Sequence, residues 1–183
     1  WFACFSSVRC AGVLAPRAVP LVQRCDTADS AHVARLMANI TTAAPTVGVW
    51  HAAGVLADAL LLEQTAGAAG RVYAPKAHGA SSLHAGCAVD AVGVFALFSS
   101  VAALLGGAGQ ANYAAANACL DALATCRRAR GRASVSVQWG AWAEVGMAAR
   151  GVASERMAAM EATSGFGRIG LAQGLASLGT ATR

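Results

Sequence analysis

Four side chains in this sequence could together perform proton-transfer chemistry on a carbonyl group. They are the hydroxyl of Ser100, the phenol of Tyr113, the amide of Asn117 and the amine of Lys76. A phenol with a pKa of about 10 is a poor proton donor at neutral pH, but a neighbouring ammonium group lowers that pKa. A serine hydroxyl can hydrogen-bond to the carbonyl oxygen as it gains negative charge. Such a group of residues suits the reduction of a carbonyl by hydride.

The spacing of these residues decides whether they can meet. Tyr113 and Asn117 lie four positions apart, which places them on one face of a helix, and Ser100 precedes Tyr113 by thirteen residues. Lys76 is the only lysine among the 14 lysine and arginine residues, and a compact ammonium tunes a phenol better than a planar guanidinium does. Taken singly, the serine could cap an element, the tyrosine could pack, the lysine could be solvated and the asparagine could be a surface amide.

The composition indicates one globular domain. The chain has 183 residues, a net charge of +5, 56% hydrophobic residues and 13% charged ones, which excludes a disordered chain and a nucleic-acid-binding surface. Its six cysteines are scattered without a C-x-x-C pair. We therefore expect reduced thiols, no metal site and a cytoplasmic location.

Two apolar segments need a separate explanation. Residues 91–120 carry no full charge, but Gly106, Gly107 and Gly109 interrupt them, so we expect a strand, a glycine loop and a helix rather than a membrane span. The first twenty residues have no basic segment before their apolar stretch, which Arg9 interrupts, so they do not fit a signal peptide. We expect residues 1–18 to be an irregular leader.

The elements that must position the four side chains follow from the hydrophobic pattern. Apolar runs predict strands, and helical spacing predicts helices between them. The expected strands cover residues 19–24, 47–51, 92–98 and 134–138, and the expected helices cover 27–40, 57–69, 75–84 and 110–130. This alternation predicts an α/β fold with a doubly wound parallel sheet of Rossmann-like type, in which ligands bind beyond the carboxyl ends of the strands. Those ends carry His51–Gly54, Ser99–Ser100 and Trp139–Trp142.

Longer motifs occur in a fixed order along the chain. They read HAAGVLAD at 51–58, FSSVAALLGGAGQANYAAAN at 98–117, LDALA at 120–124 and WGAWAEVGM at 139–147. Together with Lys76 they resemble the ketoreductase domain of type I polyketide synthases, a branch of the short-chain dehydrogenase/reductase superfamily. The resemblance covers roughly Val19 to Met147, with a looser tail to about Leu178.

The resemblance implies a role for each member of the group. Tyr113 would donate the proton, Ser100 would orient the carbonyl, Lys76 would tune the tyrosine and hold the cofactor ribose, and Asn117 would complete a proton relay. In many short-chain reductases the lysine follows the tyrosine by four residues. Here Asn117 occupies that place and Lys76 lies upstream, an exchange that is also seen in polyketide ketoreductases.

The resemblance also implies NADPH as the cofactor. Asp26 matches an acidic residue that contacts the adenine, although it could instead be a helix N-cap. Ala52, Ala53 and Gly54 match the stretch that packs against the ribose and nicotinamide, and Gly140 would lie near the nicotinamide.

Two departures from the family pattern bear on these expectations. The first strand and glycine-rich phosphate loop should precede Val19, and nothing in residues 1–18 resembles them, so we expect residues 19–183 to be the C-terminal catalytic portion of such a domain, truncated at its N-terminus. The sequence GFGRIG at 165–170 matches G-x-G-x-x-G by chance, because no strand precedes it.

Asp58 matches the last residue of a Leu-Asp-Asp signature of B-type members, with Ala57 in place of the first Asp. This match favours B-type stereochemistry, but Asp58 could also be a helix-start acid.

Three functions remain open from the sequence. The first is NADPH-dependent reduction of a β-ketoacyl thioester, held on the phosphopantetheine of an acyl carrier protein, within a polyketide or fatty acid synthase. The second is a catalytically silent segment that serves as a structural part of the multienzyme. The third is a free-standing short-chain reductase for a small ketone.

Overall fold

The computed structural model describes residues 23–41, 46–87, 92–145 and 167–183. Within them lies a parallel sheet in the order β1 (Gly48–His51), β2 (Val94–Ser100) and β3 (Val135–Trp139). These strands confirm three of the four expected from the apolar runs. The expected strand at 19–24 and the leader at 1–18 fall almost entirely outside the described residues, and residues 23 and 24 are not in a strand.

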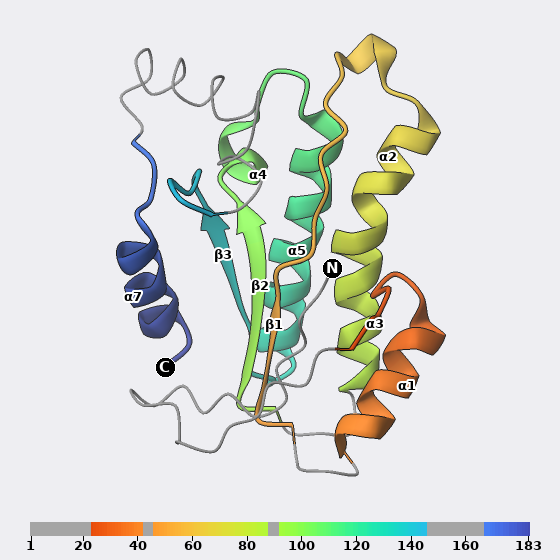
Figure 1. Cartoon of the computed structure of the whole chain (residues 1–183), viewed down its shortest axis with the longest axis vertical. Helices are drawn as coiled ribbons and strands as arrows, with labels where there is room; N and C mark the ends of the chain where they lie inside the picture. Colours follow the sequence, from red (N-terminus) through yellow and green to blue (C-terminus); the bar gives the residue numbers. More distant parts are fainter. Residues whose placement is uncertain (1–22, 42–45, 88–91, 146–166) are drawn as a thin grey trace.

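Helices flank this sheet (Figure 1). The described helical elements are α1 (Ser30–Thr41), η1 (Leu61–Glu63), α2 (Ala66–Tyr73), η2 (Ala74–His78), α3 (Gly79–Gly86), α4 (Ala102–Leu105), α5 (Ala111–Ala129) and α7 (Leu171–Ala181). The parallel sheet with flanking helices confirms the predicted α/β class. Among the described residues, no helix combines the length and the apolar character needed to cross a membrane.

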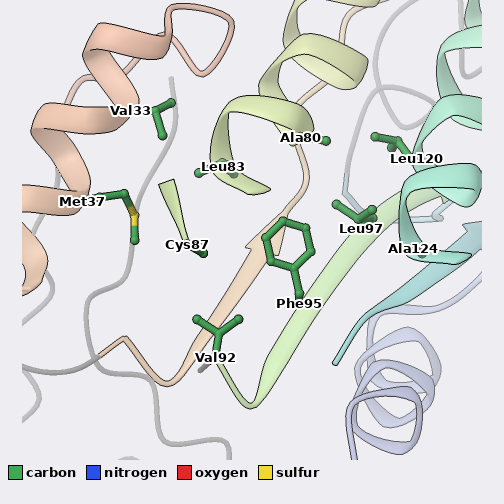
Figure 2. Packing of buried hydrophobic residues seen from close by; sticks show 10 residues of the cluster. All are labelled: Val33, Met37, Ala80, Leu83, Cys87, Val92, Phe95, Leu97, Leu120 and Ala124. Atoms are coloured by element: carbon green, nitrogen blue, oxygen red, sulfur yellow. The ribbon is translucent and has the colours of Figure 1, made fainter. Parts of the chain in front are cut away.

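One face of the sheet packs against α3 and α5. Phe95 and Leu97 of β2 are fully buried there and contact Leu83 of α3 and Leu120 of α5 (Figure 2). The parallel register sets His51 beside Leu97, so the His51 side chain points toward the same helical layer. The hydrophobic core therefore lies directly below the carboxyl end of the sheet and fixes the helices that carry the reactive side chains.

The other face carries an aromatic cluster. The ring centroids of Phe98 and Trp139 lie 5.7 Å apart, and those of Trp139 and Trp142 lie 4.8 Å apart. Helix α7 lies beside β3 (Figure 1) and its Gly174 sits against the Trp142 ring, where a Cβ atom would come within 2.1 Å of Cη2. The chain thus requires glycine at this position for α7 to dock.

The prediction of a helix over residues 57–69 is wrong for the first half of that range. Residues 52–60 are extended, η1 forms one 3₁₀ turn, and α2 begins only at Ala66, where the Thr65 hydroxyl accepts a hydrogen bond from Ala68 N–H. The leucines of this segment are exposed to solvent, by 63% at Leu60, 74% at Leu61 and 99% at Leu62. Three consecutive leucines do not define a single helical face, so this run could not by itself specify one.

Pro75 does not open a new helix as the sequence suggested. It lies within a continuous helical run formed by α2, η2 and α3, and η2 is a single wide π turn. Proline has no N–H and its ring clashes with the carbonyl four residues earlier, which explains why the helix widens here.

Candidate active site

Helix α5 places Tyr113 in its first turn, beyond the carboxyl end of β2. Burial raises the pKa of the Tyr113 phenol, hydrogen bonding with the side chains of Asn117 and Ser100 lowers it, and the charge of Asp58 raises it. The net direction is upward, so the phenol is protonated at neutral pH. Ser100 and Asn117, from a strand and a helix, therefore both lie near this hydroxyl.

Lys76 reaches the same place from the wide turn η2. Its side chain is only 3% exposed, its Nζ donates a hydrogen bond of 3.0 Å to the carbonyl of Phe98, and Nζ lies 5.3 Å from the centroid of the Tyr113 ring. Burial lowers the pKa of Lys76 to about 8, and the charge of Asp121 opposes this shift. The structure thus brings together all four residues singled out from the sequence: Lys76, Ser100, Tyr113 and Asn117.

The two consecutive serines at the end of β2 have different partners. Ser99 is buried, and its hydroxyl donates a hydrogen bond of 3.3 Å to the backbone carbonyl of Asn117. Ser100 lies on the opposite face, where its Oγ accepts a hydrogen bond of 3.2 Å from Ala102 N–H at the start of α4. Ser100 therefore bonds to the first residue of α4 and is also a neighbour of the phenol, whereas Ser99 holds α5 against the sheet.

The two polar atoms of the Asn117 side chain differ in their hydrogen bonding. Its side-chain nitrogen donates a hydrogen bond of 2.8 Å to the carbonyl of Tyr113, one turn earlier in α5. Its Oδ1 is buried and has no hydrogen-bond partner among the described residues. A buried amide oxygen without a partner costs free energy unless a water or ligand supplies a donor.

Four of the five residues expected to contact a cofactor lie at the same edge of the sheet. Ala52, Ala53 and Gly54 follow directly after β1, and Gly140 follows directly after β3. Asp26 is exposed, and its carboxylate accepts a hydrogen bond of 3.0 Å from Ala28 N–H in a tight turn.

The N-cap role that we considered for Asp26 belongs to Asp29. The Asp29 carboxylate accepts hydrogen bonds from the N–H groups of Ala31 and His32 at the start of α1. The Asp26 carboxylate therefore does not cap α1.

Asp58 lies on an extended segment rather than at a helix start. Its carboxylate accepts a hydrogen bond of 3.3 Å from the Gln110 amide, just before α5. On either side of it, the carbonyl of Ala57 accepts from Asn112 and the N–H of Ala59 donates to the carbonyl of Gly109. Gly109 has φ +74°, a conformation that favours glycine. The predicted link between Asp58 and B-type stereochemistry stays a prediction.

Sequence reasoning missed two polar contributors to the site. Asp121 lies four residues after Asn117 on α5 and accepts hydrogen bonds from the side chains of Ser136 and Gln138 on β3. The four-residue spacing from Tyr113 through Asn117 to Asp121 was a visible signal. Gln110, whose amide donates to the Asp58 carboxylate, was predicted only as the first residue of the helix at 110–130.

The parallel sheet and the four side chains at its carboxyl edge are arranged as expected for a ketoreductase domain. The KR domain family model matches residues 15–144, and the chain belongs to this family. A short-chain dehydrogenase from Mycobacterium avium, 21% identical, shares the fold with a TM-score of 0.55 over 62% of this chain and 45% of that chain.

Relatives with higher identity are polyketide synthases and their ketoreductases. The chain is 47% identical over 135 residues, 74% of its length, to the spectinabilin polyketide synthase system protein NorB of Streptomyces orinoci, and covers 6% of that protein. It is 42% identical over 133 residues, 73% of its length, to the mycoketide-CoA synthase of Mycobacterium tuberculosis, and covers 3% of it. An A1-type ketoreductase structure matches 88% of this chain and 33% of its own, with a TM-score of 0.82 and 37% identity. A C2-type ketoreductase from a modular polyketide synthase matches 90% of this chain and 35% of its own, with a TM-score of 0.75 and 36% identity.

Proposed function

We propose that this domain reduces the β-keto group of an acyl thioester to a hydroxyl group, with NADPH as the hydride donor and an acyl carrier protein holding the substrate through phosphopantetheine. The observation that carries the proposal is the position of the Lys76 amine, buried beside the ring of Tyr113, with Ser100 and Asn117 near the phenol. Membership in the KR domain family supports the same reaction.

The chain's own residues account for the proton side of the reaction. The Ser100 hydroxyl hydrogen-bonds to the carbonyl oxygen, and the Tyr113 phenol donates its proton to that oxygen as negative charge develops. The phenol suits this role because its raised pKa keeps it protonated. The Lys76 ammonium then stabilises the phenolate left behind, and burial strengthens this electrostatic interaction.

The described residues fit a dinucleotide at its two ends. The Lys76 ammonium and the Tyr113 hydroxyl are donors suited to ribose hydroxyls, the small residues Ala52 and Gly54 leave room for a flat ring, and the exposed Asp26 carboxylate can accept from the adenine amine. When bound, the reduced nicotinamide supplies the hydride. Residues that would hold its phosphates are not among those described.

The synthase setting rests on the relatives. The chain spans 3% to 6% of the two synthases compared above, so the carrier protein and the neighbouring domains belong to this proposal. Cys119 and Cys126 are exposed free thiols, which suits a reducing cytoplasm.

The test measures NADPH consumption with a β-ketoacyl thioester, with the same acyl group on a phosphopantetheinylated carrier protein, and with a simple ketone. We expect turnover of both thioesters, a lower KM for the carrier-bound one and weak turnover with NADH. Nucleotide binding without turnover of any substrate would instead identify a silent structural domain. A preference for the simple ketone would identify a free-standing reductase.

A further inference from the structure

His51 is a buried residue at the carboxyl end of β1 that contacts the segment carrying Lys76. Its side chain is 3% exposed, and its Nε2 lies 3.3 Å from the carbonyl oxygen of Lys76. A carbonyl oxygen only accepts, so Nε2 carries the hydrogen. Burial lowers the pKa of His51 to about 4, with hydrogen bonds to the backbone of Lys76 and Pro75 opposing the shift. At neutral pH the ring is therefore an uncharged donor.

The backbone that His51 holds does not have regular helical geometry. The N–H of Gly79 bonds to the carbonyls of Ala74 and Lys76 rather than to that of Pro75, which lies four residues before it. A wide turn of this kind has weaker internal restraints than an α-helix, so an external donor has a larger effect on where its residues lie.

The contact also explains the glycine at position 79. A Cβ atom on Gly79 would lie 3.2 Å from Cε1 of His51 and 2.5 Å from Oγ1 of Thr27. The absence of a side chain lets the helix approach β1 closely enough for His51 to reach the carbonyl of Lys76.

Lys76 is thus held at both ends by neighbouring strands. His51 of β1 binds its backbone carbonyl, and the carbonyl of Phe98 in β2 binds its amine. We infer that His51 is a positioning residue that fixes the wide turn so that the Lys76 amine lies beside the Tyr113 ring. The catalytic consequence rests on the reductase function proposed above.

The first experiment measures the pKa of the Lys76 amine, which depends on where the amine lies, in the absence of cofactor and substrate. Because Lys76 is the only lysine in the chain, protein labelled with ¹³C at lysine Cε gives one resonance, whose pH titration reports the pKa of this amine. The test variants are His51→Gln, whose amide nitrogen can take the place of Nε2, His51→Leu, which has no donor, and His51→Asn, whose amide is too short. Thr27→Val is the matched control, since Thr27 also lies against Gly79 and its buried hydroxyl has no partner among the described residues.

We expect the pKa of Lys76 to stay near the wild-type value of about 8 in Thr27→Val and His51→Gln. In His51→Leu and His51→Asn it should rise by about one unit or more, because a released lysine regains water around its charge. The Asn variant keeps the test decisive if the Leu variant does not fold. An unchanged pKa in folded His51→Asn or His51→Leu would overturn the inference.

The second experiment measures kcat and its dependence on pH. The Leu and Asn variants should lose about tenfold or more in kcat, with the high-pH loss of reduction shifted to higher pH because the released Lys76 amine keeps its proton to higher pH, while the Gln variant recovers kcat and its pH profile. Equal kinetics in folded Leu, Gln and wild-type proteins would refute the positioning role. A wild-type protein that shows the expected Lys76 titrations but no reductase activity would refute the proposed function and leave the positioning of Lys76 in place.

Discussion

The Lys76 amine lies 5.3 Å from the centroid of the Tyr113 ring and is fixed there by a hydrogen bond to the Phe98 carbonyl. This arrangement joins a helix that precedes β2 to a helix that follows it. Both side chains are largely buried, so a charge on the Lys76 amine has more effect on its surroundings here than it would in water.

Tyr113→Phe removes the proton donor and leaves the aromatic ring in place. We expect kcat to fall by about 10² to 10⁴-fold, because the developing oxyanion no longer receives a proton, while the Kd for NADPH changes little. Tyr73→Phe is the matched control, since Tyr73 is the other tyrosine of the chain and is only partly buried. Equal loss of nucleotide binding and turnover in Tyr113→Phe would contradict the assigned role.

Ser100→Ala and Ser99→Ala separate the two adjacent serines. Ser100→Ala should lower kcat/KM by about 10² to 10³-fold, because it removes a hydrogen-bond donor to the carbonyl oxygen. Ser99→Ala should leave kcat/KM near wild type and lower the free energy of unfolding by about 1 kcal/mol, because it removes the bond to the Asn117 carbonyl. Steady-state kinetics and urea unfolding on the same preparations check both statements, and a reversed pattern would show that Ser99 is the reacting serine.

Stability should rise with pH where Lys76 loses its proton. Its pKa is about 8 in the folded chain against 10.5 in the unfolded one. Between these values the unfolded chain binds more protons than the folded chain, so the free energy of unfolding increases with pH, by about 3 kcal/mol at most from this residue. Lys76→Met should lack this increase. Urea unfolding of both proteins at about pH 7.5 and about pH 10 measures the difference, and parallel pH dependences would show that Lys76 is not desolvated.

Gly174→Ala and Gly179→Ala compare a packed and an open position on α7. A Cβ on Gly174 would overlap the Trp142 ring, so Gly174→Ala should lower the free energy of unfolding by about 1 to 3 kcal/mol. Nothing lies within 4 Å of a Cβ on Gly179, so Gly179→Ala should raise it by up to about 1 kcal/mol through helix propensity. Thermal unfolding followed by tryptophan fluorescence checks both. A Gly174→Ala protein as stable as wild type would mean that α7 does not dock on Trp142.

Much of this architecture could be predicted from local patterns. The unbroken apolar run before Ser100 predicts β2, and the four-residue spacing of Tyr113 and Asn117 predicts the helix that carries them. Lys76 could be singled out because it is the only lysine, and the resemblance to ketoreductases assigned its partner.

The rest depends on contacts between distant segments. Residues 52–60 stay extended because their backbone and side chains bond to the start of α5, a constraint that a leucine-rich run does not display. His51 is a single histidine at a predicted strand end, and the sequence alone assigns it no partner. Its contact with Lys76 requires the parallel register, the wide turn at Pro75 and the missing Cβ of Gly79 together.

Three hydrogen bonds hold together two segments that lie some fifty residues apart in the chain. They join Ala57, Asp58 and Ala59 to Asn112, Gln110 and Gly109, respectively. Two of these bonds use only backbone atoms of the 52–60 segment, so a segment of another sequence could keep them, whereas the bond to Gln110 requires an acceptor side chain at position 58. A chimera that exchanges the segment therefore keeps this link to the first turn of α5, which carries the phenol, only if positions 58 and 110 remain a matched pair.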